Sequence, residues 1–284
     1  LVGSEMCIRD RAISGIILPM LPHKNLIPDI NLTPYSIWLA TVVVSGISYL
    51  SYLLKRYVFH ESGVLVSGII GGLYSSTATI SVLARKSRKA SEQEANEYVA
   101  AMLLAVSMMF LRFMILILIF SREIFTSIYP YLLIMSVVAA VVAWFIHSRH
   151  RRSKDMTDES EDEDSSNPLE FKVALIFATL FVVFTVLTHY TLVYAGTGGL
   201  NLLSFVSGLS DITPFILNLL QNTGSVAVLV VVACSMQAII SNILVNMFYA
   251  LFFAGKGSKL RPWILGGFGT VIGVNLVLLL FFYL

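Results

Sequence analysis

The hydrophobic and polar positions of this chain alternate on a long scale, with apolar blocks of about 20 residues separated by short polar segments. An α-helix rises about 1.5 Å per residue, so about 20 apolar residues cross a hydrocarbon layer about 30 Å thick. Eight such blocks are present, at residues 34–54, 63–84, 98–120, 124–147, 171–195, 200–220, 226–253 and 262–284. The pattern predicts an all-α, polytopic membrane helix bundle of about eight spans.

The composition supports a membrane location. Hydrophobic residues make up 57% of the chain and charged residues 13%, whereas a soluble domain carries about 25% charged residues. The lipid bilayer is therefore an expected partner of the chain. The formal charge is only +2, and no basic stripe interleaved with aromatic residues is present, so we expect no nucleic-acid partner. The two cysteines, Cys7 and Cys234, show no disulfide or metal-ligand spacing, and we expect no cofactor.

The polar segments divide the chain into five parts. Residues 1–11 do not match the apolar run that follows and are interpreted as an artefactual leader, and residues 12–33 as the end of a truncated helix plus a loop. Residues 34–147 form a first group of four helices, and residues 170–284 form a second. Between them, residues 148–169 are basic and then acidic, which is typical of a solvated linker.

The two groups resemble each other, which predicts an internal repeat. Ser67-Gly68 in the second block matches Ser207-Gly208 in the sixth block. In the next long helix of each group, a polar residue follows a serine by five positions. Because four spans per group is an even number, the sequence predicts two four-helix repeats with parallel topology, related by an axis along the membrane normal.

The short loops predict the orientation in a bacterial cytoplasmic (inner) membrane. With eight spans, ten Lys and Arg residues fall on the side of the linker and the C-terminus, and six fall on the other side. Since cytoplasmic loops are enriched in Lys and Arg, the linker and the C-terminus are expected to be cytoplasmic.

Two charged residues fall well inside the predicted spans, Arg112 and Asp211. A charge at the centre of the bilayer costs about 2.5–3.5 kcal/mol on insertion scales, so such residues usually find a partner or line a wet cavity. We hypothesise that Arg112 and Asp211 meet as an intramembrane charge pair, directly or through an ion or water. The alternative is a structural ion pair without a role in transport.

Polar and small residues accompany these charges in the second, third, sixth and seventh blocks. They could line a hydrophilic path for a small ion or solute. The alternative is that they form hydrogen bonds that only hold the helices together. In the sixth block, four of them recur with helical spacing, which predicts one polar face, and Pro214 predicts a bend there. The candidate path residues are Gly68, Gly72, Ser75, Ser76, Thr77, Thr79, Ser107, Ser204, Gly208, Asn218, Gln237, Ser241, Asn242 and Asn246.

Several of these strings resemble a known family. The Gly-Gly-Leu-x-Ser-Ser-Thr-Ala-Thr run that ends at Thr79, the Met-Phe-Leu-Arg element that ends at Arg112, and Ser-Gly-Leu-Ser-Asp211 are similar to a bacterial membrane domain of unknown function (number four-thousand-and-ten). That domain is commonly found C-terminal to an MgtC/SapB-type membrane domain. The resemblance implies a multi-pass membrane protein, with an MgtC-like domain as a partner and a link to Mg²⁺ through domain association only.

These observations favour a transporter or channel-like protein for a small ion or solute. The alternative is a non-transporting membrane partner or regulator of an MgtC-like protein, and a homo-oligomer is a further expected assembly. We expect no enzymatic activity and no catalytic residues, because no span holds an aspartate dyad or a Ser/His pair in a recognisable motif. The metal ligands, if any, are unknown, since a single buried carboxylate is a poor site for Mg²⁺, which prefers octahedral oxygen coordination.

Overall fold

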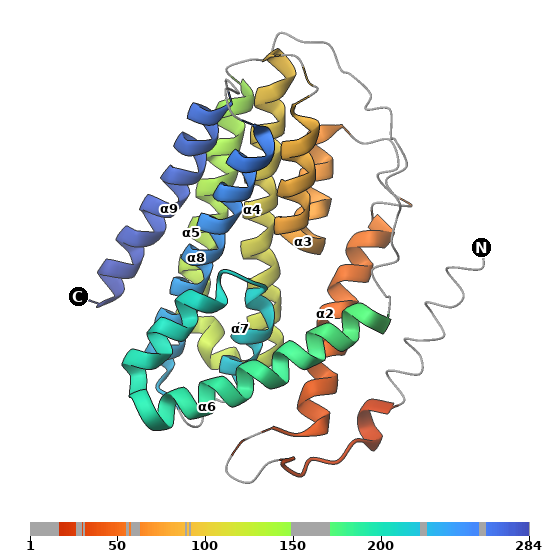
Figure 1. Ribbon diagram of the computed structural model, residues 1–284, viewed down its shortest axis with the longest axis vertical. Coiled ribbons are helices and arrows are strands. Elements are labelled where there is room, and N and C mark those ends of the chain that lie inside the picture. The colour runs from red at the N-terminus through yellow and green to blue at the C-terminus, as the bar shows by residue number, and fades with distance from the viewer. Residues whose placement is uncertain are drawn as a thin grey trace.

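The computed structural model consists of long helices that run mostly side by side (Figure 1). It describes residues 17–26, 30, 32–54, 57, 63–88, 90, 92–148, 171–221, 226–255 and 260–283. The elements are η1 (Leu18–Met20), α2 (Pro34–Leu53), α3 (Val64–Lys86), α4 (Glu92–Phe120), α5 (Arg122–Ser148), α6 (Phe171–Ser207), α7 (Ile212–Gln221), α8 (Val228–Ala254) and α9 (Arg261–Tyr283). The leader at residues 1–11 and nearly all of the charged linker lie outside the described residues.

Seven of these helices are long and apolar enough to cross a membrane, and the chain is therefore a membrane-spanning helical protein. The prediction of about eight spans differs from this number at the sixth block. Residues 200–220 do not form one helix: their first part continues α6, and their last part forms α7. Because α7 has 10 residues and is only about 15 Å long, it cannot cross the bilayer.

The helix α3 is broken at Ser75, whose backbone is extended (φ −156°, ψ 106°). The chain folds back at this residue, so that residues 64–74 and 76–86 form the two arms of a helical hairpin. In a straight helix Gly71 and Thr79 would lie about 12 Å apart along the axis. In α3 a Cβ atom added at Gly71 would lie 2.5 Å from the hydroxyl oxygen of Thr79. Each arm of this α3 hairpin has 11 residues, about half of what a membrane crossing requires.

A second hairpin lies between α6 and α8. The helix α6 turns sharply at Gly196, which adopts φ 59° and ψ −153°, a conformation that favours glycine. The last part of α6, residues 198–207, then runs beside α8. The chain turns at residues 208–211, which form the tip of the hairpin, and α7 leads away from this tip (Figure 1). The far end of α7 reaches the start of α2, where the side chain of Gln221 donates to the carbonyl of Ser36 at 3.3 Å. We call residues 198–221 the α6–α7 hairpin.

The directions of the long helices contradict a parallel repeat. The end of α3, which leads directly into α4, contacts the end of α8: Arg88 donates to the carbonyl of Phe252 at 3.0 Å. The start of α4 and the end of α8 therefore lie at the same end of the bundle, and these two helices run in opposite directions. The predicted parallel topology is wrong because it counted four crossings in each half, whereas α3 folds back on itself and α7 is too short to cross.

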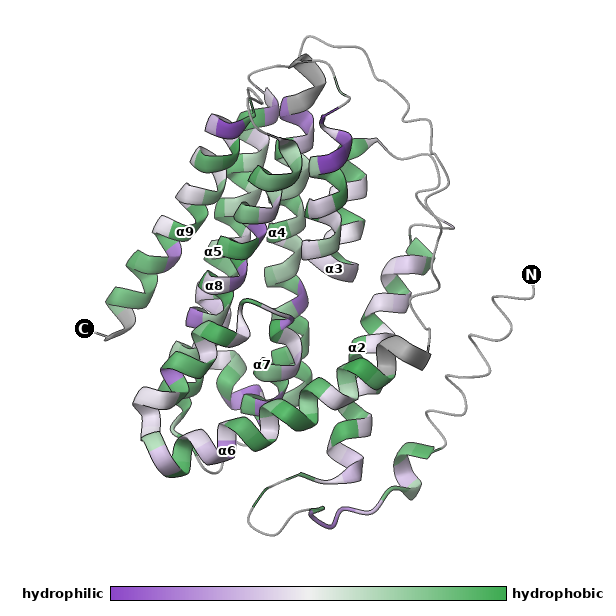
Figure 2. Ribbon diagram, viewed as in Figure 1, coloured by the Kyte–Doolittle hydropathy of each residue, from purple (hydrophilic) through white to green (hydrophobic). Residues whose placement is uncertain are grey.

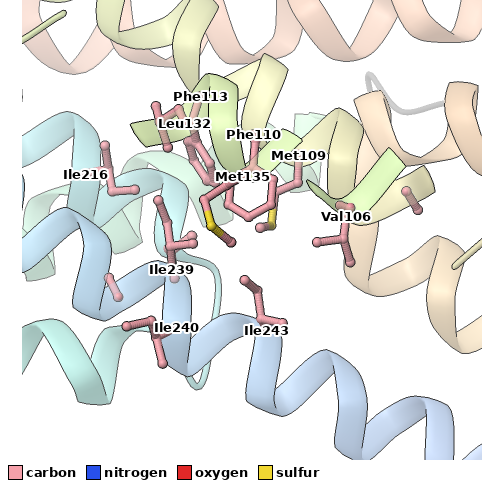
Figure 3. Close-up of a cluster of buried hydrophobic side chains, with 14 of the residues drawn as sticks. Val106, Met109, Phe110, Phe113, Leu132, Met135, Ile216, Ile239, Ile240 and Ile243 are labelled. Atoms are coloured by element: carbon pink, nitrogen blue, oxygen red, sulfur yellow. The ribbon is translucent and has the colours of Figure 1, made fainter. Parts of the chain in front are cut away.

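Apolar side chains hold the long helices together. Figure 3 shows Phe110 and Phe113 of α4 with Met135 of α5, Ile216 of α7 and Ile239 of α8 in one cluster. α8 is the most buried of the candidate spans, so it forms the centre of the bundle.

The outer faces of α5, α6 and α9 carry exposed large apolar side chains, as a lipid-facing surface requires. Hydrophilic residues gather at the end of the bundle where α3 ends and α9 begins (Figure 2).

Candidate binding site at the two hairpin tips

The tip of the α3 hairpin is held by Arg112 of α4. The guanidinium Nη1 donates to the backbone carbonyl of Tyr74 at 2.8 Å. Tyr74 is the last residue of the first arm, where the end of a helix leaves carbonyl groups without a partner in the helix and carries a partial negative charge. The half-buried cation at this position supplies the donor and complements the helix dipole.

Ser75 begins the second arm of the same hairpin. Its hydroxyl oxygen accepts from the backbone N–H of Ala78 at 3.3 Å, which is the arrangement of a helix N-cap. The extended backbone of Ser75 ends one helix and its side chain starts the next. The Ser-Ser-Thr run therefore marks a helix break rather than a continuous polar face.

The tip of the α6–α7 hairpin is built in a similar way. The carboxylate of Asp211 accepts from the backbone N–H of Thr213 at 3.0 Å and caps α7, where a negative charge is favourable. The side-chain amide of Asn242 in α8 donates to the carbonyls of Gly208 at 3.3 Å and Ser210 at 3.4 Å. These bonds satisfy carbonyl groups that the break leaves without helical partners.

Arg112 lies in α4 and Asp211 directly precedes α7, and these two helices contact each other. Among the described residues, however, the guanidinium donates to the Tyr74 carbonyl and the carboxylate accepts from the start of α7. The structure therefore pairs each charge with a helix end of opposite partial charge. Direct or bridged contact between them remains the hypothesis drawn from the sequence.

Three buried polar atoms around the tips have no hydrogen-bond partner among the described residues. They are Nε of Arg112, the hydroxyl oxygen of Ser241 and Oδ1 of Asn246. Ser241 packs against Gly208 at the tip, and Asn246 donates to Asn242 at 3.1 Å. Unsatisfied buried polar atoms are costly in a protein interior, so their concentration here indicates a place for a polar ligand or water. Asn275 of α9 also has a buried oxygen with no hydrogen-bond partner in the described ranges.

The remaining candidate path residues make contacts between helices. Ser107 binds the hydroxyl of Ser136 in α5 at 3.0 Å, and Ser204 donates to Gln237 in α8 at 2.8 Å. Asn218 donates to Thr188 in α6 at 2.7 Å. Each of these bonds joins two helices.

The glycines of the first hairpin arm allow close helix packing. A Cβ added at Gly72 would lie 2.5 Å from Cα of Ala105, and one at Gly68 would overlap the carbonyl of Ala101. On the second arm, Ser76 is buried, and the carbonyl of Thr77 accepts from Ser81.

The predicted polar face of the sixth block is wrong. Ser204 faces Gln237 of α8, whereas Asn218 faces α6, and the chain is not helical between them at Leu209 to Asp211. The reason is the break itself, because the two segments belong to different arms of a hairpin and helical spacing does not continue across the tip.

Sequence reasoning missed several groups that build this site. The carbonyls of Tyr74 and Ser210 accept from Arg112 and Asn242, and Asn201 accepts from the thiol of Cys234 at 3.4 Å. Backbone acceptors leave no signal in residue type, although the Ser-Ser-Thr and Ser-Asp-Ile-Thr strings are typical helix starts. In the part of the chain that the structure describes, no three His, Cys, Asp or Glu side chains gather as a metal site would require.

These features define a multi-pass helical membrane protein with two hairpins, one whose tip is bonded to Arg112 and one whose tip ends at Asp211. The chain belongs to the family described as "Domain of unknown function (DUF4010)", whose match covers residues 42–254. It is 27% identical over 221 residues to an "Uncharacterized protein" of Aquifex aeolicus (strain VF5), which covers 77% of this chain and 94% of the relative. No solved structure matches the chain.

Proposed function

We propose that this protein transports a small ion or solute across the bacterial cytoplasmic membrane, with its binding site between the two hairpin tips. The observation that carries the proposal is the presence of two broken helices, at Tyr74–Ser75, where Arg112 is bonded to the tip, and at Gly208–Asp211. Polar backbone at membrane depth is tolerated where it is buried in protein or lines a water-filled cavity. In many transporters discontinuous helices of this kind form the substrate site near the middle of the bilayer.

The unpaired polar atoms support the same location. A purely structural break would be expected to satisfy its buried donors and acceptors, because each unsatisfied group costs about 1–3 kcal/mol. Beside the tips, Arg112 and Ser241 each keep a buried atom that has no hydrogen-bond partner within the described part of the chain. A substrate or water molecule bound there would supply the missing hydrogen bonds.

The chemistry of the tips suits a small polar solute better than a bare divalent cation. Asp211 is one carboxylate, already bound to the start of α7, and the neighbouring Arg112 repels a cation. Mg²⁺ prefers six oxygen ligands and gives up its waters reluctantly. The pair of opposite charges fits a substrate that carries an anionic group, with or without a coupled cation.

The test is uptake into proteoliposomes across a panel of ions and small anions. We expect flux of one class in the wild type and at least a tenfold loss in Arg112→Ala and Asp211→Asn. Gly266→Ala is a matched control, because a Cβ at this exposed position of α9 meets no atom within 4 Å. If both variants retain the flux of the wild type, the transport path does not lie between the two hairpin tips. Absence of flux for the whole panel, in folded wild-type protein, would favour a non-transporting partner of an MgtC-like protein.

A further inference from the structure

Each hairpin packs on the long helix that follows it with the same sequence spacing. In the first half, Gly68 contacts Ala101 and Gly72 contacts Ala105. In the second half, Ser204 bonds to Gln237 and Gly208 contacts Ser241. The partners in every one of these pairs are 33 positions apart. In both halves, therefore, the first arm of the hairpin runs parallel to the next long helix in the same register.

The two hairpin tips also correspond residue by residue. Gly72-Leu73 matches Gly208-Leu209, and the N-cap Ser75 matches the N-cap Asp211, all at a constant offset of 136 positions. This register differs by four residues from the alignment that the sequence pattern predicted, in which Ser67-Gly68 matches Ser207-Gly208. It is supported by contacts as well as by residue types, since Gly72 and Gly208 both lie against the backbone of the next long helix.

The corresponding helices run in opposite directions. The end of α3 contacts the end of α8 through Arg88, so α4 begins where α8 ends. A Cβ at Gly267, near the start of α9, would lie 2.7 Å from Leu103 of α4 and 3.4 Å from Ile146, near the end of α5. α5 and α9 are therefore also antiparallel. The first half of the chain can therefore be superposed on the second half only if the first half is turned upside down with respect to the membrane.

We propose that the chain consists of two inverted repeats, each made of one crossing helix, one re-entrant hairpin and two further crossing helices. The crossings are α2, α4 and α5 in the first repeat and α6, α8 and α9 in the second. The α3 hairpin enters from the cytoplasmic side and the α6–α7 hairpin enters from the opposite side. The inverted relation of the two repeats rests on the contacts above, and the side from which each hairpin enters rests on the distribution of positive charge. The arrangement gives the proposed substrate site one hairpin facing each side of the membrane.

The distribution of positive charge assigns the sides. With six crossings, and with residues 1–11 and Arg112 left out of the count, fourteen Lys and Arg residues fall at the end where α3 ends, and Lys24 and Arg122 fall at the other end. The eight-span arrangement divides the same residues ten to six. Because cytoplasmic loops are enriched in Lys and Arg, the stronger asymmetry supports six crossings. The fourteen residues are Lys55, Arg56, Arg85, Lys86, Arg88, Lys89, Arg149, Arg151, Arg152, Lys154, Lys172, Lys256, Lys259 and Arg261.

Single cysteines in a variant lacking Cys7 and Cys234, labelled with a membrane-impermeant maleimide, test this arrangement. Labelling is compared between right-side-out and inside-out membrane vesicles. Gly63→Cys and Arg88→Cys flank the α3 hairpin, and we expect both to react only from the cytoplasmic side. Gly198→Cys and Ala227→Cys flank the α6–α7 hairpin, and we expect both to react only from the outside. All four positions are exposed.

Opposite sidedness within either pair would overturn the inverted repeat, because that hairpin would then be a crossing. Arg261→Cys decides the orientation: labelling from the cytoplasmic side supports the proposal, and labelling from outside overturns it. A C-terminal alkaline phosphatase fusion gives an independent measurement that does not depend on thiol reactivity. We expect it to be active, because the C-terminus lies outside with six crossings, and an inactive fusion at normal expression would contradict the proposal. These outcomes do not depend on flux, so they distinguish a failure of the topology from a failure of the transport proposal.

Discussion

At the scale of single residues, each of the two intramembrane charges is stabilised by a hydrogen bond to the end of a helix. Arg112 donates to the last carbonyl of one hairpin arm, and Asp211 caps the first turn of α7. A charge that is stabilised by a helix end does not require an oppositely charged side chain in contact. This explains how the bundle holds both charges while Nε of Arg112 has no hydrogen-bond partner among the residues that the structure describes.

Replacement of Arg112 tests this role. Arg112→Ala removes the charged donor to the carbonyl of Tyr74, so we expect a loss of about 1–3 kcal/mol in the free energy of unfolding. Arg112→Lys keeps the charge and one donor but loses the planar fork, and we expect an intermediate loss. Thermal unfolding in detergent measures both. Equal stability of Arg112→Ala and wild type would show that the bond to Tyr74 contributes little.

Asp211 allows charge to be separated from capping. Asparagine caps a helix about as well as aspartate, so Asp211→Asn should keep the stability of the wild type while losing the charge. Asp211→Ala loses both, and we expect it to be less stable by about 1 kcal/mol. Flux and thermal unfolding are measured on the same samples. If Asp211→Asn and Asp211→Ala have equal stability, Asp211 does not act as a cap.

At the scale of elements, the hairpins depend on close contact between their first arms and the following long helices. Gly72 and Gly208 approach backbone atoms of α4 and α8 so closely that a side chain has no space. In lipid, small residues at such contacts let helix backbones pack together. The glycines near the tips are therefore part of the packing that positions the tips.

Alanine substitutions measure this packing. We expect Gly72→Ala and Gly208→Ala each to destabilise the protein by about 1–3 kcal/mol, because the added methyl group meets backbone or Cβ atoms that cannot rotate away. Gly269→Ala is the matched control, since this glycine of α9 has no atom within 4 Å of an added Cβ. The measurement is the shift in unfolding temperature. A shift for Gly269→Ala as large as those at the hairpins would contradict this explanation.

At the scale of the whole molecule, the transport proposal requires the hairpins to move relative to the long helices. In the α6–α7 hairpin, Asn201 lies beside the buried thiol of Cys234 in α8, with its side-chain oxygen 3.4 Å from the sulfur. A thiol at position 201 would therefore be well placed to bond to Cys234. Such a bond would fix the first arm of the hairpin to the centre of the bundle.

We expect oxidised Asn201→Cys to form this cross-link and to lose flux, because the arm can no longer part from α8 to open the site. Flux should return after reduction. Asn201→Ser, treated in the same way, is the control and should be unaffected by the oxidant. Full flux in completely cross-linked protein would show that this arm and α8 move as one body.

The sequence alone determined the class of the protein. Apolar blocks of this length with few charges form spanning helices in a lipid bilayer, because a helix satisfies its own backbone polar groups. The membrane bundle therefore follows from composition and block length. The rarity of intramembrane charge also singled out Arg112 and Asp211, because a charge in lipid is retained only where the protein stabilises it.

Only the tertiary structure decided which apolar blocks are hairpins and how the halves are oriented. A block such as residues 63–84 is long enough to cross once or to enter and return, and hydropathy is the same in both cases. The choice depends on a single extended residue, Ser75, and on whether a partner such as Arg112 satisfies the freed carbonyl of Tyr74. That partner comes from another helix, so no local pattern could reveal it. When a block forms a hairpin instead of a crossing, the direction of every later helix is reversed. For this reason the sequence predicted the membrane bundle correctly but gave the wrong relation between its two halves.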